Sequence, residues 1–196
     1  MKPILNILLV STLLISCAGN DDISENPKPT EKTLYNLEYK NYLVKNVTLY
    51  KGPIAQESDP GESYLTAYWG TYQEPIWGKI SLDIKNSSLQ LISETSAGIK
   101  YTITVDKDSV FINDYNELTY IGNFNREKSS FTLKRSLQYV KKVPRTDFGP
   151  MFISQTNTFG VTQYETIFGK SAFNKPAEMT ESGDVVLWSN IEYQYQ

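Results

Sequence analysis

Apolar residues recur at every second position through most of the sequence after residue 34, and this alternation constrains the fold more than any other feature. In the run Ile76–Ile84 every second residue is isoleucine, leucine or glycine, and the residues between them are mostly polar. The run Ile99–Val105 alternates in the same way with lysine and threonine. A period of two is that of a β-strand with one buried and one solvated face.

Short strands joined by turn-rich links predict an all-β fold, a single antiparallel β-barrel or sandwich. We expect at most one short helix, at about 163–168, because residues 162–165 fit a capping box and Gly169 can end the helix. The predicted strands are Leu37–Tyr39, Tyr42–Tyr50, Tyr64–Tyr72, Ile76–Ile84, Leu89–Ile92, Ile99–Val105, Val110–Ile112, Leu118–Phe124, Ser130–Lys141 and Val185–Tyr193.

The N-terminus has the pattern of an export signal. Lys2 is followed by the mostly apolar run Ile4–Ile15 and then by small residues around Cys17. The stretch from Met1 to Cys17 is shorter than the roughly 20 residues that a transmembrane helix needs. Cys17 is the one cysteine of the chain, so it has no intramolecular disulfide to make. The alternatives are an ordinary signal peptide with an incidental cysteine, or a buried apolar helix.

The tetrad Leu14-Ile15-Ser16-Cys17 resembles the lipobox of bacterial lipoproteins. The resemblance implies a signal peptide over residues 1–16, cleavage before Cys17, and acylation of that cysteine, which would anchor the chain in a membrane. Residues 17–33 then form a flexible tether, polar and with two prolines, and residues 34–196 form the β domain. By resemblance to the sorting rules of such lipoproteins, Ala18 favours the outer membrane, with the domain facing the periplasm or the cell surface.

Composition excludes several classes of function. The 196 residues include no histidine, which rules out Ser-His-Asp triads and histidine-based zinc sites. The net charge of −3 argues against nucleic acid as a partner, because nucleic-acid binding needs a basic patch. A chain of this length buries enough surface to fold without disulfides or metal.

Aromatic residues gather between positions 64 and 77. Tyr64, Tyr68 and Tyr72 share one face of their predicted strand, Trp69 lies on the other, and Trp77 follows shortly after. Such side chains can stack on sugar rings or line a pocket for an apolar ligand, so these five are the candidate ligand-binding residues. The alternative is an ordinary sheet with one core face and one half-exposed tyrosine face.

Gly70-Thr71-Tyr72 resembles the Gly-x-Trp strand with which lipocalin-like and avidin-like barrels begin, with tyrosine in place of tryptophan. The resemblance covers roughly residues 64–142. It implies a barrel that holds a ligand, and it favours a lipocalin-like barrel over a sandwich.

Two further motifs lead to no site. The tripeptide Gly169-Lys170-Ser171 looks like the end of a P-loop, but Tyr164 stands where the pattern needs glycine. Four potential calcium ligands lie close together, but they lack EF-hand spacing and fit two turns that flank a strand. These are Asp106, Asp108, Asn113 and Asp114. We therefore expect no metal and no cofactor.

A basic stretch runs along the end of the strand predicted at 130–141. Alternation puts Lys134 and Arg135 on opposite faces, which favours a solvated strand edge protected by lysine over a binding patch. The other members of the stretch are Lys141, Lys142 and Arg145.

Binding is the function that the sequence favours. We expect an outer-membrane lipoprotein that binds a small apolar or glycan ligand, and the alternative is an envelope structural or interaction module whose protein partner the sequence does not name. A hydrolase with a carboxylate pair is less favoured, because isolated carboxylates in loops are usually just solvated. Its candidate acids are Asp147, Glu165, Glu178, Glu181, Asp184 and Glu192.

Overall fold

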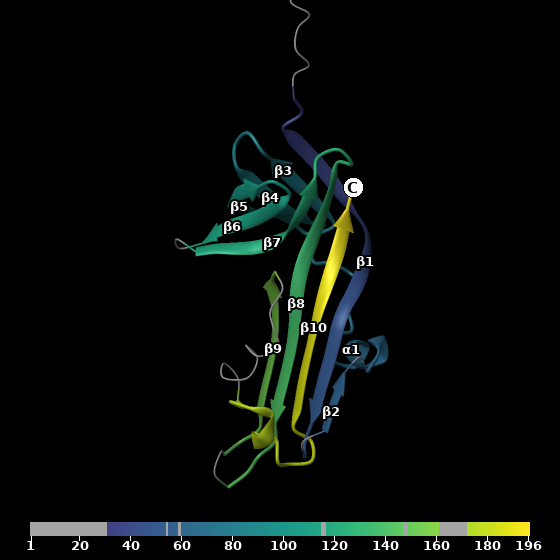
Figure 1. Cartoon of the computed structure of the whole chain (residues 1–196), viewed down its shortest axis with the longest axis vertical. Helices are drawn as coiled ribbons and strands as arrows, with labels where there is room; N and C mark the ends of the chain where they lie inside the picture. The colour runs from purple at the N-terminus through teal and green to yellow at the C-terminus, as the bar shows by residue number, and fades with distance from the viewer. Residues whose placement is uncertain (1–30, 54, 59, 115–116, 147–148, 161–171) are drawn as a thin grey trace, which may run out of the picture. The chain divides into compact units, whose positions relative to one another are not determined.

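Eight antiparallel strands close into a β-barrel (Figure 1). The computed structural model describes residues 31–53, 55–58, 60–114, 117–146, 149–160 and 172–196. The strands are β1 (Leu34–Lys51), β2 (Ala55–Ser58), β3 (Lys79–Asp83), β4 (Ser88–Ser93), β5 (Ser96–Asp106), β6 (Ser109–Asp114), β7 (Glu117–Asn125), β8 (Ser130–Lys142), β9 (Phe152–Phe159) and β10 (Val185–Tyr195). In the described residues the helices are α1 (Glu62–Tyr68) and a 3-10 turn, η2 (Pro176–Glu178).

The barrel follows the order β1-β3-β4-β5-β6-β7-β8-β10, and β10 pairs with β1 to close the ring. All of these pairings are antiparallel. The predicted all-β class with a barrel is therefore confirmed, and the sandwich alternative is wrong. A barrel of about eight strands has an interior that side chains can fill or that can hold one small ligand.

Three strands are long enough to belong to the barrel and to extend beyond it. Residues 48–51 of β1 pair with β2, and residues 135–142 of β8 pair with β9. With β10 between them, these strands form the sheet β2-β1-β10-β8-β9, which Figure 1 shows below the short strands β3–β7. Each of the long strands β1, β8 and β10 therefore contributes residues both to the barrel and to this sheet.

Strand β10 is buried on both faces. Leu187 and Ile191 face the main core, which runs from the barrel onto this sheet. Val186 and Trp188 face a second cluster that includes Phe173 and Met179. Burial on both sides explains why nearly every residue of β10 is apolar or uncharged over its first half.

Most of the predicted strands are confirmed, with small shifts at their ends. The two strands predicted at 37–39 and 42–50 are one continuous strand, β1, which contains two register shifts that bend it. Turns at 84–87, 107–108 and 126–129 join β3 to β4, β5 to β6, and β7 to β8.

The strand predicted at Tyr64–Tyr72 is wrong. Residues 62–68 form helix α1, and Gly70-Thr71-Tyr72 lies in a turn after it, so the residues that resembled a first barrel strand are not in a strand. A spacing of four residues places Tyr64, Tyr68 and Tyr72 on one face of a strand, and it would do the same in a helix. The tyrosine pattern alone therefore does not distinguish a helix from a strand. Leu65 is the one buried residue of the helix, and Glu62 in the first turn suits the helix dipole.

Two other differences concern strand limits. The strand predicted from Ile76 begins only at Lys79, and Ile76 is 61% exposed. Strand β9 was not predicted, because its sequence between Ile153 and Phe159 is polar and it pairs on one side only among the described strands. The helix predicted at 163–168 lies outside the described residues, as do residues 1–30.

Candidate functional site

The loop that joins α1 to β3, residues 69–78, is held against the barrel core by three tyrosine hydroxyls; we call it the covering loop. Tyr193 donates to the carbonyl oxygen of residue 72 at 2.8 Å, and Tyr195 donates to that of residue 77 at 2.9 Å. Tyr39 donates to the carbonyl oxygen of residue 73 at 2.9 Å. Buried phenols generally find such acceptors. The backbone of the loop is therefore held at residues 72, 73 and 77.

Burial changes the acidity of these tyrosines. It raises the pKa of Tyr193 to about 12, and it also raises the pKa of Tyr195. Burial raises the pKa of Tyr39 as well, with smaller contributions from Tyr42 and Glu74. All three hydroxyls are therefore protonated at neutral pH and can donate to the covering loop.

A cavity of about 140 Å³ lies between the covering loop and strands β8, β9 and β10. A cavity of roughly 150 Å³ in another protein holds benzene, so this one has room for about one ring. Glu74 and Ile76 are exposed, so they mark the side that meets solvent. The lining residues are Trp69, Thr71, Tyr72, Glu74, Pro75, Ile76, Trp77, Leu133, Arg135, Leu137, Asn157 and Tyr193.

Arg135 occupies an apolar column of β8. Phe131, Leu133, Leu137 and Tyr139 point from the same face of the strand into the main core, and Arg135 lies at the centre of this column. Only 6% of Arg135 is exposed. The strand therefore carries a guanidinium into the main core at the position where the cavity lies.

The guanidinium is held by neutral groups. Its Nε donates to Oδ1 of Asn157 and its Nη2 to the carbonyl oxygen of Asn157, both at 2.6 Å. Its Cζ lies 4.9 Å from the ring centre of Trp77 and 4.3 Å from that of Phe159, within the range of cation–π contacts. Trp77 and Phe159 are themselves stacked, with their ring centres 5.5 Å apart. These contacts fix the orientation of Arg135 without neutralising its charge.

No carboxylate of the described residues forms an ion pair with Arg135. Burial lowers the pKa of Arg135 to about 10, and the nearby Tyr193 and Tyr101 counter part of this effect. Arg135 is therefore still charged at neutral pH. A buried charge without a counter-ion costs free energy, so its presence here needs an explanation other than folding.

The cavity wall also includes a residue with a buried donor that has no partner among the described residues. The indole Nε1 of Trp69 is buried and makes no hydrogen bond to any group in the described part of the chain. An unpaired buried donor costs roughly 1–3 kcal/mol. Trp69 and Arg135 thus both line the same cavity, and each has at least one N–H group without a hydrogen-bond partner among the described residues.

The structure brings together three of the five sequence-predicted ligand-binding residues. Trp69, Tyr72 and Trp77 line the cavity. Tyr64 lies instead beside Lys51, whose Nζ donates to its hydroxyl at 3.0 Å. Tyr68 packs on Tyr139, with ring centres 4.4 Å apart, and is not part of the cavity wall.

The interpretation of the basic stretch as a solvated strand edge is wrong. Strand β8 is flanked by β10 on one side and by β7 and β9 on the other, so it has no free edge over residues 130–142. Arg135 was assigned correctly to the face opposite Lys134, but its burial was missed. The signal was present in the sequence, because Arg135 interrupts an alternating apolar column from Phe131 to Tyr139. Asn157 was not predicted as a site residue, because its strand, β9, was not predicted either.

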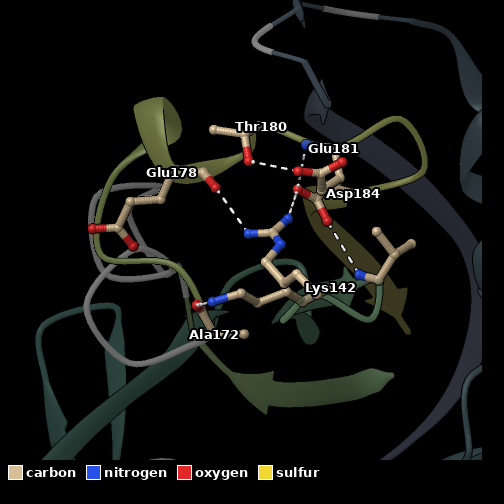
Figure 2. Close-up of polar contacts among 8 residues, drawn as sticks. Lys142, Ala172, Glu178, Thr180, Glu181 and Asp184 are labelled. Carbon is tan, nitrogen blue, oxygen red and sulfur yellow. Dashed lines mark hydrogen bonds and ion pairs between the residues drawn. The ribbon is translucent and has the colours of Figure 1, made fainter. Parts of the chain in front are cut away.

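The candidate catalytic acids of the described residues make structural contacts. Asp184 is fully buried, pairs with the Nη2 of Arg145, and accepts hydrogen bonds from the backbone N–H of residues 143 and 181 (Figure 2). Glu178 accepts from the backbone N–H of Asn174, and Glu192 forms ion pairs with two lysines of neighbouring strands. Asp147 and Glu165 lie outside the described residues.

The other sequence motifs add no site. Asp106 and Asp108 lie in and beside the turn between β5 and β6, as predicted, and Asn113 accepts a hydrogen bond from Thr104 across the hairpin. Within the described ranges, no three acidic or thiol side chains gather as metal ligands would. Cys17 and the tripeptide 169–171 fall outside those ranges.

A scan against protein-family models, a search of curated proteins and a search of solved structures each found no match to this chain. A separate inspection of the described helices found none with the length and apolar character required to traverse a bilayer.

Proposed function

We propose that this chain is a lipid-anchored envelope protein whose barrel, lipocalin-like in its closure, binds a small apolar or glycan ligand in the cavity under the covering loop. The observation that carries the proposal is the cavity of about 140 Å³, walled by Trp69, Tyr72 and Trp77 and by two leucines of β8. A concave, mostly apolar site with a few convergent polar groups is the usual form of a small-molecule site.

Two features favour an apolar ligand over a glycan. The ring of Trp77 is already stacked on Phe159 and contacted by Arg135, which leaves less of its face for a sugar ring. Leu133 and Leu137 offer no hydrogen bonds to sugar hydroxyls, which would then lose their water without replacement.

Native mass spectrometry of the full chain, purified gently from the envelope of its host, tests the proposal. We expect a reproducible extra mass of one small molecule. Ile76→Trp at the mouth of the cavity should reduce that occupancy, whereas Ile99→Trp should not, since Ile99 is also an exposed isoleucine but does not line the cavity. If both variants retain the extra mass, the molecule is bound elsewhere.

Membrane anchoring rests on Cys17 and has its own test. Fatty-acid labelling of the wild-type chain should give a lipidated protein in the outer-membrane fraction, and Cys17→Ala should be unlabelled. Equal labelling of the two chains would remove Cys17 as the anchor. The labelling also separates this part of the proposal from ligand binding, which the cavity supports independently.

A second candidate function, contact with another envelope protein, is favoured by an exposed apolar segment at the start of β9. Met151, Phe152 and Ile153 are 51%, 37% and 54% exposed. Among the described strands β9 pairs with β8 alone, so no described strand pairs with its other edge. Photo-crosslinking in intact cells from position 153, with position 99 as control, should then capture one protein at 153 only. If neither position gives a crosslinked partner and the protein runs as a monomer in both cases, this candidate is rejected.

A further inference from the structure

The charge of Arg135 is not explained by the fold. Its neighbours in the column on β8 are all apolar or aromatic, and its two hydrogen bonds go to the neutral Asn157. Replacing such a buried charge with an apolar residue often leaves a protein equally stable or more stable. A charge in this position is therefore better explained by something that it binds than by the packing of the barrel.

The guanidinium of Arg135, which lines the cavity, has unused donors. Its Nε and Nη2 each make one hydrogen bond to Asn157, and its Nη1 makes none to the described residues. Arginine carries several N–H donors in a planar fork, which matches the two oxygens of a carboxylate. Trp69, whose buried Nε1 has no acceptor, lines the same cavity and offers one more donor.

The cavity beside this charge limits the rest of the ligand. Its volume of about 140 Å³ takes about one ring, and leucine, isoleucine, proline and aromatic side chains form most of its wall. Among the described residues that line it, Arg135 is the one cation. A phosphate, which carries more charge and holds water more strongly, would need more cations than this wall provides.

On the basis of the ligand-binding function proposed above, we propose that the ligand is a compact apolar carboxylate of about one ring, whose carboxylate pairs with Arg135 while its ring fills the cavity. Arg135 is then the specificity-determining residue. It selects for the anion, and the wall of the cavity selects for size. A longer apolar acid exceeds this volume and would extend past Glu74 and Ile76 into solvent.

Three probes of matched structure test this assignment by NMR titration of the purified full chain at low ionic strength. Benzoate has both the ring and the charge, benzamide has the ring alone, and acetate has the charge alone. The readouts are the indole N–H resonances of Trp69 and Trp77, which line the cavity, with Trp188 in the second cluster as internal control. We expect benzoate to shift the first two and to bind roughly tenfold more tightly than either other probe.

Each alternative result has a separate meaning. Equal affinity for benzoate and benzamide overturns the role of charge and leaves the ligand-binding function standing. Equal affinity for benzoate and acetate makes the site a simple anion site and overturns the role of the ring. If no probe shifts Trp69 or Trp77, the cavity does not bind small molecules of this size, and the proposed function fails with the inference.

Substitutions then test Arg135 directly. Arg135→Gln should reduce benzoate affinity to that of benzamide. Lys134→Gln removes the same charge from the adjacent residue on the opposite face of β8 and should leave the preference for benzoate unchanged. If both variants lose the preference equally, general electrostatics rather than Arg135 selects the anion. The wild-type comparison of probes decides the proposal even if Arg135→Gln does not fold.

Discussion

The hydroxyl of Tyr195 donates a hydrogen bond of 2.9 Å to the carbonyl oxygen of Trp77, and this bond joins the barrel-closing strand β10 to the loop that covers the cavity. The two residues are both buried in the main core. The bond therefore couples two parts of the chain that are 118 residues apart in sequence. The closing strand of the barrel and the wall of the candidate site are one structural unit.

Tyr195→Phe should lower the free energy of unfolding by about 1–3 kcal/mol, because it leaves the carbonyl oxygen of Trp77 buried without a donor. Urea denaturation measures the loss. Tyr35→Phe is a matched control, since Tyr35 donates a bond of the same length to the carbonyl oxygen of Lys32, away from the covering loop. Tyr195→Phe should also speed the exchange of the Trp77 indole N–H with solvent, and Tyr35→Phe should not. Equal exchange rates would show that the bond does not hold the loop.

Stability should fall as the pH rises from about 10 to about 12. Over this range the unfolded chain loses the proton of Tyr193 while the folded chain, in which burial raises its pKa to about 12, keeps it. Below about pH 10 both states are protonated and the stabilisation is complete. Arg135, whose pKa burial lowers to about 10, acts in the opposite sense, but it is one group against five tyrosines with raised pKa. These are Tyr39, Tyr42, Tyr139, Tyr193 and Tyr195.

Urea denaturation between about pH 9 and about pH 12 measures this dependence. Tyr193→Phe should make the fall shallower, because phenylalanine has no proton to lose. A rise in stability over the same range would contradict the assignment of neutral, buried tyrosines around the covering loop.

Asp184→Ala should destabilise the protein by about 3–5 kcal/mol, because it leaves the guanidinium of Arg145 without its buried partner. It also removes the acceptor of two backbone N–H groups (Figure 2). Glu192→Ala is the control, since the ion pairs of Glu192 are partly exposed and should contribute no more than about 1 kcal/mol. Thermal unfolding of both variants distinguishes them. If the two variants lose a similar amount of stability, the contacts of Asp184 stabilise the fold no more than the partly exposed ion pairs of Glu192 do.

Gly122→Ala should be strongly destabilising, by about 2 kcal/mol or more, because of close packing between β7 and β8. Gly122 has a φ of 152°, and a Cβ there would lie 1.9 Å from the carbonyl oxygen of Thr132. Gly78→Ala is the control, since a Cβ at Gly78 meets no atom within 4 Å and its φ is ordinary. Chemical denaturation of the two variants gives the comparison, and equal stability would contradict the close approach of these strands.

The alternation of apolar residues was enough to predict the class of the fold, because most barrel strands have one face in the core and one face that is more exposed, although β10 is buried on both. The pattern of Ser130–Lys142 predicted β8 almost to its ends. It failed at Tyr64–Tyr72, where a spacing of four satisfies both helix and strand, and at β9, where polar residues face outward at a sheet edge.

The candidate site was predicted only in part. Trp69, Tyr72 and Trp77 are aromatic and close in sequence, so composition alone drew attention to them. Arg135 lies on β8 and Asn157 on β9, both far in sequence from the tryptophans of the covering loop. The pairing of these two strands brings Arg135 and Asn157 together. Local sequence patterns carry no information on such contacts, although an arginine in an apolar column marks a position that needs an explanation.

The pairing of β1 with β10 also determines when the barrel can form. During synthesis β1 emerges long before β10, and its residues from Tyr39 to Lys51 have no partner in the ring until β10 is made. Contacts between such distant segments are slow to form, because a long loop must close first. Because Tyr193 of β10 lines the cavity, the cavity is complete only once this last strand has paired with β1.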